Sequence, residues 1–302
     1  MSAILPALAA ILGETLPTVE VADVGAALLG ASERWAPLVE VGAARVTGFE
    51  PNPMQRARLL AAQRPGLRIL PQALGRGGKA TLHLTHYPGC SSLYEPDPQV
   101  IDRFAGAWAQ PEGNFHVVGT VEVETSRLDD LVAAGICPAP DYLKLDVQGG
   151  ERDVLEGAMR TLAGVSVVEC EVEFVPLYKG QPLFHDVAAL LQAQGFLLHQ
   201  LRDVAGQAMR PFLLARSKLE PLSQLLWADA VFVRDFTTAP SWPDAMLLKA
   251  ALVLHDAYAS ADLAFQLLAE HDRRSGGDRA RRYGAGLAGR ALQSLMITVA
   301  QC

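Results

Sequence analysis

Short apolar runs alternate with longer amphipathic stretches through most of the chain. The apolar runs predict strands near residues 19–24, 45–50, 67–70, 141–147, 165–174, 196–201, 212–215 and 227–234. Apolar residues at helical spacing between them predict helices near residues 32–42, 54–63, 151–162 and 184–194. Strands that alternate with helices are typical of an α/β fold, here a three-layer sandwich around a mostly parallel sheet.

The segment between residues 71 and 140 has a different pattern. Residues 79–85 and 116–125 alternate between apolar and polar with period two, which predicts an antiparallel pair of strands. Residues 97–108 between them are expected to be helical and to lie over the sheet like a lid.

No strand pattern returns after a change of composition at residues 237–243. Beyond it, residues 244–258, 261–271 and 279–298 carry Leu and Ala at helical spacing. We therefore expect a short helical lead at residues 1–18, a main domain at 19–236 and a C-terminal helical extension at 237–302.

Composition narrows the possible partners. The chain has 302 residues and a net charge of −7, so nothing indicates binding to nucleic acid or to an anionic membrane surface. We expect no membrane span, because no apolar run is long enough. The first basic residue is Arg34, which argues against a secretory signal, and the 4 cysteines are scattered, so a cytoplasmic protein is expected.

The stretch from Asp141 to Glu151 is the strongest candidate for a functional site. Its apolar residues predict a buried strand, Asp146 falls where that strand ends, and Gly149 and Gly150 follow before a helix. Ligands of parallel sheets bind beyond the carboxyl ends of the strands. Asp146 is therefore either a site residue or only the N-cap of the helix.

The first two predicted strands also end in acids. Asp23 and Gly25 close the first strand, and Glu50 closes the second, a little over twenty residues later. A glycine turn followed at this distance by a carboxylate is the usual arrangement for binding a nucleotide-like ligand and its ribose hydroxyls. The pair of features is more specific than either one alone.

Two further clusters of charge stand out. Glu169, Glu171 and Glu173 share one face of a predicted strand, so Glu171 and Glu173 are expected either to reach a polar cleft or to form a solvated strand end. An arginine cluster, which consists of Arg273, Arg274, Arg279, Arg281 and Arg282, is either an anion or partner contact or a solvated loop.

Several motifs occur in an order that resembles the FkbM-type methyltransferases. They are DVGA at 23–26, FEPNP at 49–53, ALG at 73–75, GCSSL at 89–93, RLDDL at 127–131, DYLKLDVQGGE at 141–151 and VEFVPLYKGQPLF at 172–184. This resemblance implies the class I methyltransferase fold, a Rossmann-like three-layer sandwich with a mostly parallel seven-stranded sheet. It also implies S-adenosylmethionine as the cofactor and, as the acceptor, a hydroxyl of a sugar, glycan or polyketide-like small molecule.

The resemblance also assigns roles to individual residues. The cofactor-binding residues it implies are Asp23, Gly25, Ala26, Glu50, Pro51, Asn52, Ala73, Leu74 and Asp146. Asp146 is the first candidate for the base that removes the acceptor proton, the alternatives are Glu151, Glu171 and Glu173, and His86 is a weaker one. Expected acceptor contacts are Ser91, Ser92, Glu173, Tyr178, Lys179 and Gln181, although Tyr178, Lys179 and Gln181 would equally suit a packed structural loop.

A metal bridging Asp146 and Glu171 is not expected, since the sequence offers no further fixed ligand set. One departure from the family pattern is Ala27, which stands where an Asn is usual. It leaves open a second hypothesis, a non-catalytic protein of this fold that acts, or forms a homo-oligomer, through its helical tail. A nicotinamide-dependent oxidoreductase is disfavoured because residues 25–30 do not read G-x-G-x-x-G.

Overall fold

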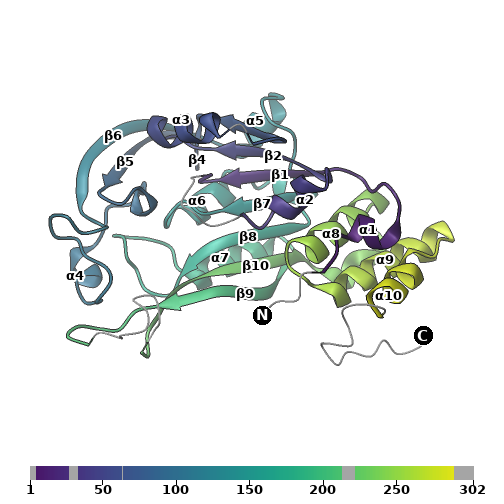
Figure 1. Cartoon of the computed structure of the whole chain (residues 1–302). Coiled ribbons are helices and arrows are strands. Elements are labelled where there is room, and N and C mark those ends of the chain that lie inside the picture. Colours follow the sequence, from purple (N-terminus) through teal and green to yellow (C-terminus); the bar gives the residue numbers. More distant parts are fainter. Residues whose placement is uncertain (1–4, 27–32, 63, 213–221, 289–302) are drawn as a thin grey trace.

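A seven-stranded sheet forms the centre of the protein (Figure 1). The computed structural model describes residues 5–26, 33–62, 64–212 and 222–288. In sheet order the strands are β3 (Leu67–Leu70), β2 (Ala44–Phe49), β1 (Val19–Val24), β7 (Tyr142–Leu145), β8 (Val167–Glu173), β10 (Leu225–Arg234) and β9 (Phe196–Gly206). Only β10 runs antiparallel to its neighbours, so the predicted class I methyltransferase sheet is confirmed.

Helices cover both faces of this sheet because successive strand residues point to opposite sides. Val21, Tyr142 and Val167 face one layer, which contains α1 (Leu8–Leu12), α2 (Ala36–Glu40), α8 (Asp244–Asp256), α9 (Ala261–Ser275) and α10 (Arg279–Ala288). Ala22, Leu143 and Val168 face the other, with α5 (Leu128–Ala133), α6 (Glu151–Glu156), the 3₁₀ turn Thr161–Gly164 and α7 (Phe184–Ala193). The near-continuous apolar runs of β1, β7 and β8 thus supply two cores.

The C-terminal helices are part of this sandwich. Leu247, Leu254 and Leu268 are buried in the same core as Val19 of β1 and Val233 of β10. Figure 1 shows α8, α9 and α10 gathered beside α1 at one end of the sheet. The segment expected as an extension therefore covers one face of the sheet and continues its core.

A second, three-stranded sheet lies near the ends of the central strands. It has the order β4 (Ala73–Leu74), β6 (Val117–Ser126) and β5 (Gly78–Thr85), with β5 antiparallel to β6 as predicted. Residues 97–108 were predicted to be helical, but only α4 (Pro98–Ile101) forms there. That segment instead buries Phe104 against Phe115, Leu177 and Leu226 in a small third core.

Some helices are shorter than predicted, and α6 is one of them. α6 ends at Glu156, and its C-cap Gly157 lies against the backbone of Gly75, where a Cβ at residue 157 would come within 2.1 Å of the Gly75 oxygen. The N-cap of α6 is Gly150, so the interpretation of Asp146 as its cap is wrong.

The remaining elements lie close to their predicted positions. α3 spans Pro53–Ala61, and short 3₁₀ turns occur at Pro88–Cys90 and Phe236–Ser241. Most of the predicted strand at 212–215 and the end of the helix predicted at 279–298 fall outside the described residues. None of the described helices combines the length and the apolar character that a membrane crossing requires.

Candidate active site

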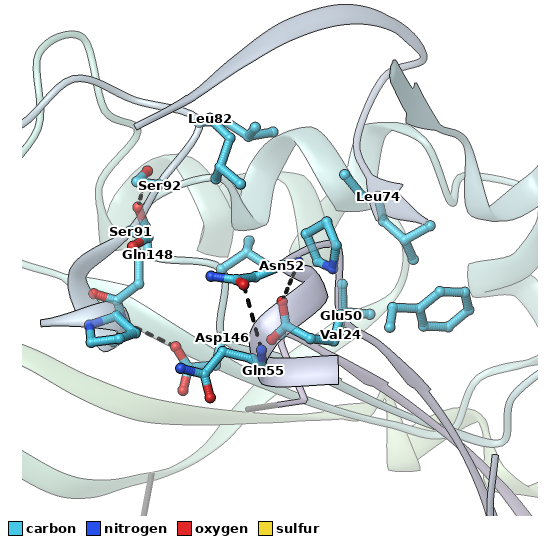
Figure 2. Close-up of a pocket in the computed structure, with 18 of the residues that line it drawn as sticks. Val24, Glu50, Asn52, Gln55, Leu74, Leu82, Ser91, Ser92, Asp146 and Gln148 are labelled. Atoms are coloured by element: carbon cyan, nitrogen blue, oxygen red, sulfur yellow. Dashed lines mark hydrogen bonds between the residues drawn. The ribbon is translucent and has the colours of Figure 1, made fainter. Parts of the chain in front are cut away.

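A cavity opens where β1, β2 and β7 end, and its walls contain most of the residues that were expected to bind the cofactor (Figure 2). It holds about 780 Å³ of space free of protein atoms, part of it open to solvent. The lining residues are Val24, Gly25, Phe49, Glu50, Pro51, Asn52, Gln55, Gln72, Ala73, Leu74, Leu82, Pro88, Gly89, Ser91, Ser92, Leu93, Asp146, Val147 and Gln148.

Gly25 forms the floor of the cavity at the point where three strand ends meet. Its φ is +86°, and a Cβ there would lie 1.8 Å from the backbone oxygen of Asp146. Its N–H and that of Ala26 donate to the Phe49 oxygen at 3.0 and 3.2 Å, and the Asp146 N–H donates to the Val24 oxygen at 3.0 Å. Only glycine allows this approach, so Gly25 fixes the shape of the floor.

Asp23 lies behind the cavity, where it is 1 % exposed. Its Oδ2 accepts a hydrogen bond from the Trp35 indole at 3.0 Å, and its Oδ1 is 3.3 Å from Nζ of Lys144. Burial disfavours the charged form of Lys144, but the carboxylates of Asp23, Asp146 and Glu33 outweigh it and raise the lysine pKa well above its ordinary value. Asp23 therefore supports the strand ends, and Ala26, also buried, does not line the cavity.

Glu50 places a nearly buried carboxylate on the cavity wall, 6 % exposed. The Asn52 N–H donates to its Oε1 at 2.7 Å, while the Asn52 side chain caps α3 by accepting from Met54 N at 3.0 Å. Burial raises the pKa of Glu50, because little in this wall hydrates the charge. A carboxylate held this way is suited to accept hydrogen bonds from ribose hydroxyls.

The wall beside Glu50 also contains acceptor atoms without donors. Oε1 of Gln55 and Oε1 of Gln72 are buried and have no hydrogen-bond partner within the described residues. Both side chains line the cavity, as do the apolar residues Phe49 and Leu74. Buried acceptors are normally paired, so this wall fits a flat apolar group that carries N–H or O–H donors, as adenosine does.

Gln148 links the carboxylates at the other side of the cavity. Its Nε2 donates to Oδ1 of Asp146 at 3.0 Å and to Oε2 of Glu171 at 2.5 Å. Its Oε1 accepts from the Tyr178 hydroxyl at 3.1 Å. In Figure 2, Gln148 and Ser92 lie on one side of the cavity and Leu74 on the other. Asp146 thus faces the cavity, and Glu171 joins it through one amide.

Strongly perturbed acids surround this pair. Burial raises the pKa of Glu171 well above its ordinary value, and the negative charge of Asp146 adds to the effect. Burial also raises the pKa of Glu173, with contributions from Glu151 and Asp146. For Asp229 on β10, burial raises the pKa to about 7. None of these three acids lines the cavity, so their raised pKa values describe the buried surroundings of Asp146.

The other candidate bases are less well placed. Glu151 is 2 % exposed and does not line the cavity, and its Oε1 accepts from the Val147 N–H at 2.8 Å. Burial raises its pKa to about 7. Glu173 is buried outside the cavity lining, and His86 is exposed outside it.

The two serines expected to contact the acceptor line the cavity, but their hydroxyls are used by the protein. Ser92 Oγ donates to the Gln148 oxygen at 2.6 Å and accepts from Tyr94 N at 2.9 Å. Ser91 Oγ lies 3.2 Å from Thr85 Oγ1 and accepts from Thr85 N at 3.1 Å. In this structure, both serines hold the loop in place.

The loop after β8 lies behind the cavity. Tyr178 is 1 % exposed, and Gln181 accepts from its backbone N–H at 3.0 Å. The Gln181 side chain packs against Gly149, where a Cβ would come within 2.8 Å. Lys179 is exposed and pairs with Glu95 at 2.6 Å. These contacts support the structural-loop alternative more than direct contact with an acceptor.

Sequence reasoning did not single out several cavity residues: Phe49, Gln55, Gln72, Leu82 and Gln148. Three of them had a usable signal. Gln55 lies in the first turn of the helix that follows Glu50, Gln72 is two residues after the end of β3, and Gln148 is two residues after Asp146. Each is therefore close to a strand end on the ligand side of the sheet.

Each arginine of the cluster forms an ion pair with an acid of the same chain. The ion pairs are Arg273 with Glu270, Arg274 with Glu270 and Asp244, Arg279 and Arg282 with Glu14, and Arg281 with Asp278. Arg274 also donates to the backbone oxygens of Trp242 and Ala239 at 2.5 and 2.6 Å. The cluster thus has acidic partners that join α9 and α10 to their neighbours.

Metal ligation has no support in the part of the chain that the structure describes. There, no group of 3 or more His, Cys, Asp or Glu side chains is arranged to hold a metal ion. Cys90, Cys137 and Cys170 are buried free thiols.

Comparison with known proteins identifies the family. The methyltransferase FkbM domain matches residues 23–198. The 2-O-methyltransferase NoeI of Sinorhizobium fredii is 26% identical over 170 residues, which cover 53% of this chain and 67% of that protein. The hexuronic acid methyltransferase AglP of Haloferax volcanii is 30% identical over 131 residues, 43% of this chain and 47% of that protein.

A solved structure, methyltransferase FkbM from Methylobacillus flagellatus KT, gives a TM-score of 0.41 at 15% identity and covers 73% of this chain and 44% of that one. The FkbM domain covers more than half of this chain, from the end of β1 into β9. The chain therefore belongs to the FkbM family of S-adenosylmethionine-dependent methyltransferases.

Proposed function

We propose that this methyltransferase methylates a hydroxyl of a sugar or glycan, with Asp146 as the base that accepts the hydroxyl proton. The observation that carries the proposal is the position of Asp146. It is a partly exposed carboxylate, 33% by side chain, on the cavity wall that Gly25 also forms. It is the acid among the candidate bases that lines the cavity.

The cofactor site that we propose consists of the strand-end residues. Gly25 provides a surface that a ligand can approach closely, Glu50 accepts hydrogen bonds from the ribose hydroxyls, and Ala73 and Leu74 contact the adenine. Pro51 and Asn52 complete the wall beside Glu50, while Asp23 and Ala26 support the floor from behind. The unpaired Oε1 atoms of Gln55 and Gln72 offer additional acceptors.

The protein's contribution to catalysis is mainly positioning and proton removal. When bound, S-adenosylmethionine supplies an electrophilic methyl group for an in-line displacement. Asp146 takes the proton from the acceptor oxygen, and general-base help of this kind is worth roughly 10²- to 10⁴-fold in rate. Lys144 Nζ at 3.9 Å from Oδ2 and Gln148 Nε2 at 3.0 Å from Oδ1 orient the carboxylate.

The class of acceptor is proposed from the relatives and from the chemistry of the site. The names of the two relatives, a 2-O-methyltransferase and a hexuronic acid methyltransferase, support an oxygen acceptor on a sugar. The matches cover 67% and 47% of those proteins, so a sugar acceptor for this chain is part of our proposal. A base close to the cofactor cavity suits an alcohol, since its proton must leave during transfer.

The test is a two-stage assay. Binding of S-adenosylmethionine is first measured by calorimetry, and the protein is then incubated with cofactor and a panel of neutral, amino and acidic sugars. We expect release of S-adenosylhomocysteine together with a sugar that is heavier by one methyl group in mass spectrometry. Asp146→Asn should lower kcat by about 10² or more. Asp130→Asn, which changes an exposed aspartate on α5, should leave the rate unchanged.

The outcomes separate the possible failures. Cofactor binding without turnover on any sugar in the panel would contradict the proposed acceptor class. Full activity of Asp146→Asn on an accepted sugar would contradict the proposed base, while the acceptor class would stand.

A further inference from the structure

Gln148 has an unusual backbone conformation for its residue type. It lies in the loop between β7 and α6 with φ of +59°. Left-handed conformations favour glycine, and other residues adopt them at a cost of roughly 1 kcal/mol or more. Gly149 and Gly150 follow directly, so the chain has glycine next to this position but keeps a glutamine in it. The side chain of Gln148 therefore warrants a functional explanation.

The side chain of Gln148 uses all of its polar groups within the site. Its amide nitrogen donates to Asp146 Oδ1 at 3.0 Å and to Glu171 Oε2 at 2.5 Å, and an amide has two N–H groups for two such acceptors. Its Oε1 lies 3.1 Å from the hydroxyl of Tyr178, which is itself 3.0 Å from the Cys90 oxygen. The rotamer is thus held at both ends of the amide.

The backbone of Gln148 is held as well. Ser92 Oγ donates to its carbonyl oxygen at 2.6 Å, and Ser92 comes from the loop that closes the cavity. Gln148 therefore connects the loop after β7 with β8, the loop after β8 and the loop that carries Cys90 and Ser92.

We propose that Gln148 is a positioning residue, which holds the carboxylates of Asp146 and Glu171 in one arrangement so that Asp146 faces the acceptor hydroxyl. Two carboxylates this close repel each other, and a single amide that donates to both offsets the repulsion and fixes their orientation. The inference rests on the proposed function of Asp146 as the base. It adds a residue that sets the geometry of that base.

The charges around the pair make this contribution large. Burial raises the pKa of Glu171, and the acids that face it come from several elements: Asp146 after β7, Glu173 on β8, Glu151 on α6 and Asp229 on β10. Lys144 of β7 lies on the opposite side of Asp146 and also forms ion pairs with Asp23 and Glu33. Arg34 lies 3.6 Å from Asp229. The Gln148 amide is thus the neutral donor that the two carboxylates share.

Two substitutions separate positioning from a structural role. Gln148→Gly removes the side chain and its hydrogen bonds but suits the positive φ, and because these two effects oppose each other we expect only a small change in thermal stability. The value of kcat should fall about tenfold or more, and the Kd for S-adenosylmethionine should change less than about threefold, because misplaced groups slow the chemical step. Gln148→Glu keeps the length of the side chain and an acceptor for Tyr178, but places a third carboxylate beside Asp146 and Glu171.

The pH dependence of kcat/KM is the measurement that a merely structural role of Gln148 would leave unchanged. The acid limb of kcat/KM should move to higher pH by about one unit in Gln148→Gly, and further in Gln148→Glu, since lost donors or an added negative charge favour the protonated pair. Gln192→Glu, a matched change on an exposed face of α7, should leave the pH profile in place.

A measurement without acceptor keeps this inference separate from the proposed function. The carboxyl carbons of ¹³C-labelled protein can be titrated by NMR, with Glu171→Gln and Asp146→Asn to assign the signals. We expect the apparent pKa values of the pair to rise in Gln148→Glu, even if no sugar in the panel is methylated. Unchanged carboxyl titration in both Gln148 variants, or native kcat and pH profile in Gln148→Gly, would overturn the inference.

Discussion

The half of the cavity that we propose binds the cofactor (the cofactor half) and the half that we propose binds the acceptor (the acceptor half) are built in different ways. In the cofactor half, each wall comes from a residue at or directly after a strand end, such as Gly25 after β1, Glu50 after β2 and Leu74 in β4. In the acceptor half, the contacts join residues far apart in the chain: Gln148 with Tyr178, 30 residues apart, and Ser92 with Gln148, 56 apart. Residues at the ends of strands can be located from sequence motifs. A network of side-chain hydrogen bonds cannot, because it depends on how distant segments pack.

The halves also differ in charge. The cofactor half presents one nearly buried carboxylate, Glu50, among apolar residues and amides. In the acceptor half, Asp146 lies beside buried Glu171, Glu173 and Glu151, whose pKa values are all raised first of all by burial. Substitutions in the first half should therefore act on cofactor affinity, and those in the second on proton transfer and pH dependence.

The largest expected effect is on the shared floor of the two halves. In Gly25→Ala the new Cβ would have to displace the Asp146 oxygen, which lies 1.8 Å from its position, at a residue with φ of +86°. We expect a loss of about 3 kcal/mol in the free energy of unfolding by urea, together with loss of cofactor binding in calorimetry.

Gly119→Ala is the matched control for this change, because a Cβ on that glycine of β6 meets nothing within 4 Å. If Gly25→Ala bound the cofactor as tightly as the native protein, the close approach of β1 and β7 would have no part in forming the site.

Glu50→Gln should separate the cofactor half from the acceptor half. The variant keeps an acceptor for the Asn52 N–H but loses the charge, so we expect the Kd for S-adenosylmethionine to rise about tenfold. Burial raises the pKa of Glu50, and protonation removes acceptor capacity. Native affinity should therefore weaken as pH falls through that pKa, while the affinity of the variant should show no such limb.

Calorimetry over a pH series measures both effects, and Glu124→Gln, an exposed change on β6, is the control. A variant with native affinity and the native pH limb would show that Glu50 does not contact the ribose.

A smaller effect is expected from Glu151, which supports the acceptor half from behind. Burial raises its pKa from 4.5 to about 7, so between these values the folded protein keeps a proton that the unfolded chain releases. Stability should accordingly fall as pH rises through this window. Glu151→Gln keeps an acceptor for Val147 N and removes the cost of ionising a buried carboxyl group. At pH 8 we therefore expect the variant to be more stable than the native protein by about 1 kcal/mol.

Urea unfolding at pH 5 and pH 8 measures that difference. Burial also raises the pKa of Glu33 and of Asp229 to about 7, so part of the slope should remain in the variant. The same slope in native protein and variant would mean that Glu151 does not retain a proton in the folded state.

The half of the cavity that we propose binds the cofactor is lined largely by residues that the sequence had singled out. Gly25, Glu50, Asn52 and Leu74 were expected there and line the cavity, because a parallel sheet brings the ends of its strands to one edge whatever the details of packing. The resemblance to the FkbM family indicated which ligand to expect, and the ends of the predicted strands indicated where it would bind.

The acceptor half was located only in part. Asp146 lies on the cavity wall, but the hydroxyls of Ser92 and Tyr178 and the amide of Gln181 are hydrogen-bonded within the protein. Whether a polar side chain faces a ligand or a neighbour depends on which residues lie opposite it. Those residues come from other loops, and the spacing of a motif does not reveal them.

The alternation of apolar runs and helical segments determined the sandwich, and the acids at or near the ends of β1, β2 and β7 predicted the edge of the sheet at which the cavity opens. Only the tertiary structure decided that α8 covers a face of the sheet and that the arginines near α9 and α10 pair with nearby acids. It also decided that Gln148 joins Asp146 to Glu171. The reason is that periodicity and strand ends are set by local geometry, whereas hydrogen-bond partners are set by the packing of segments that are distant along the chain.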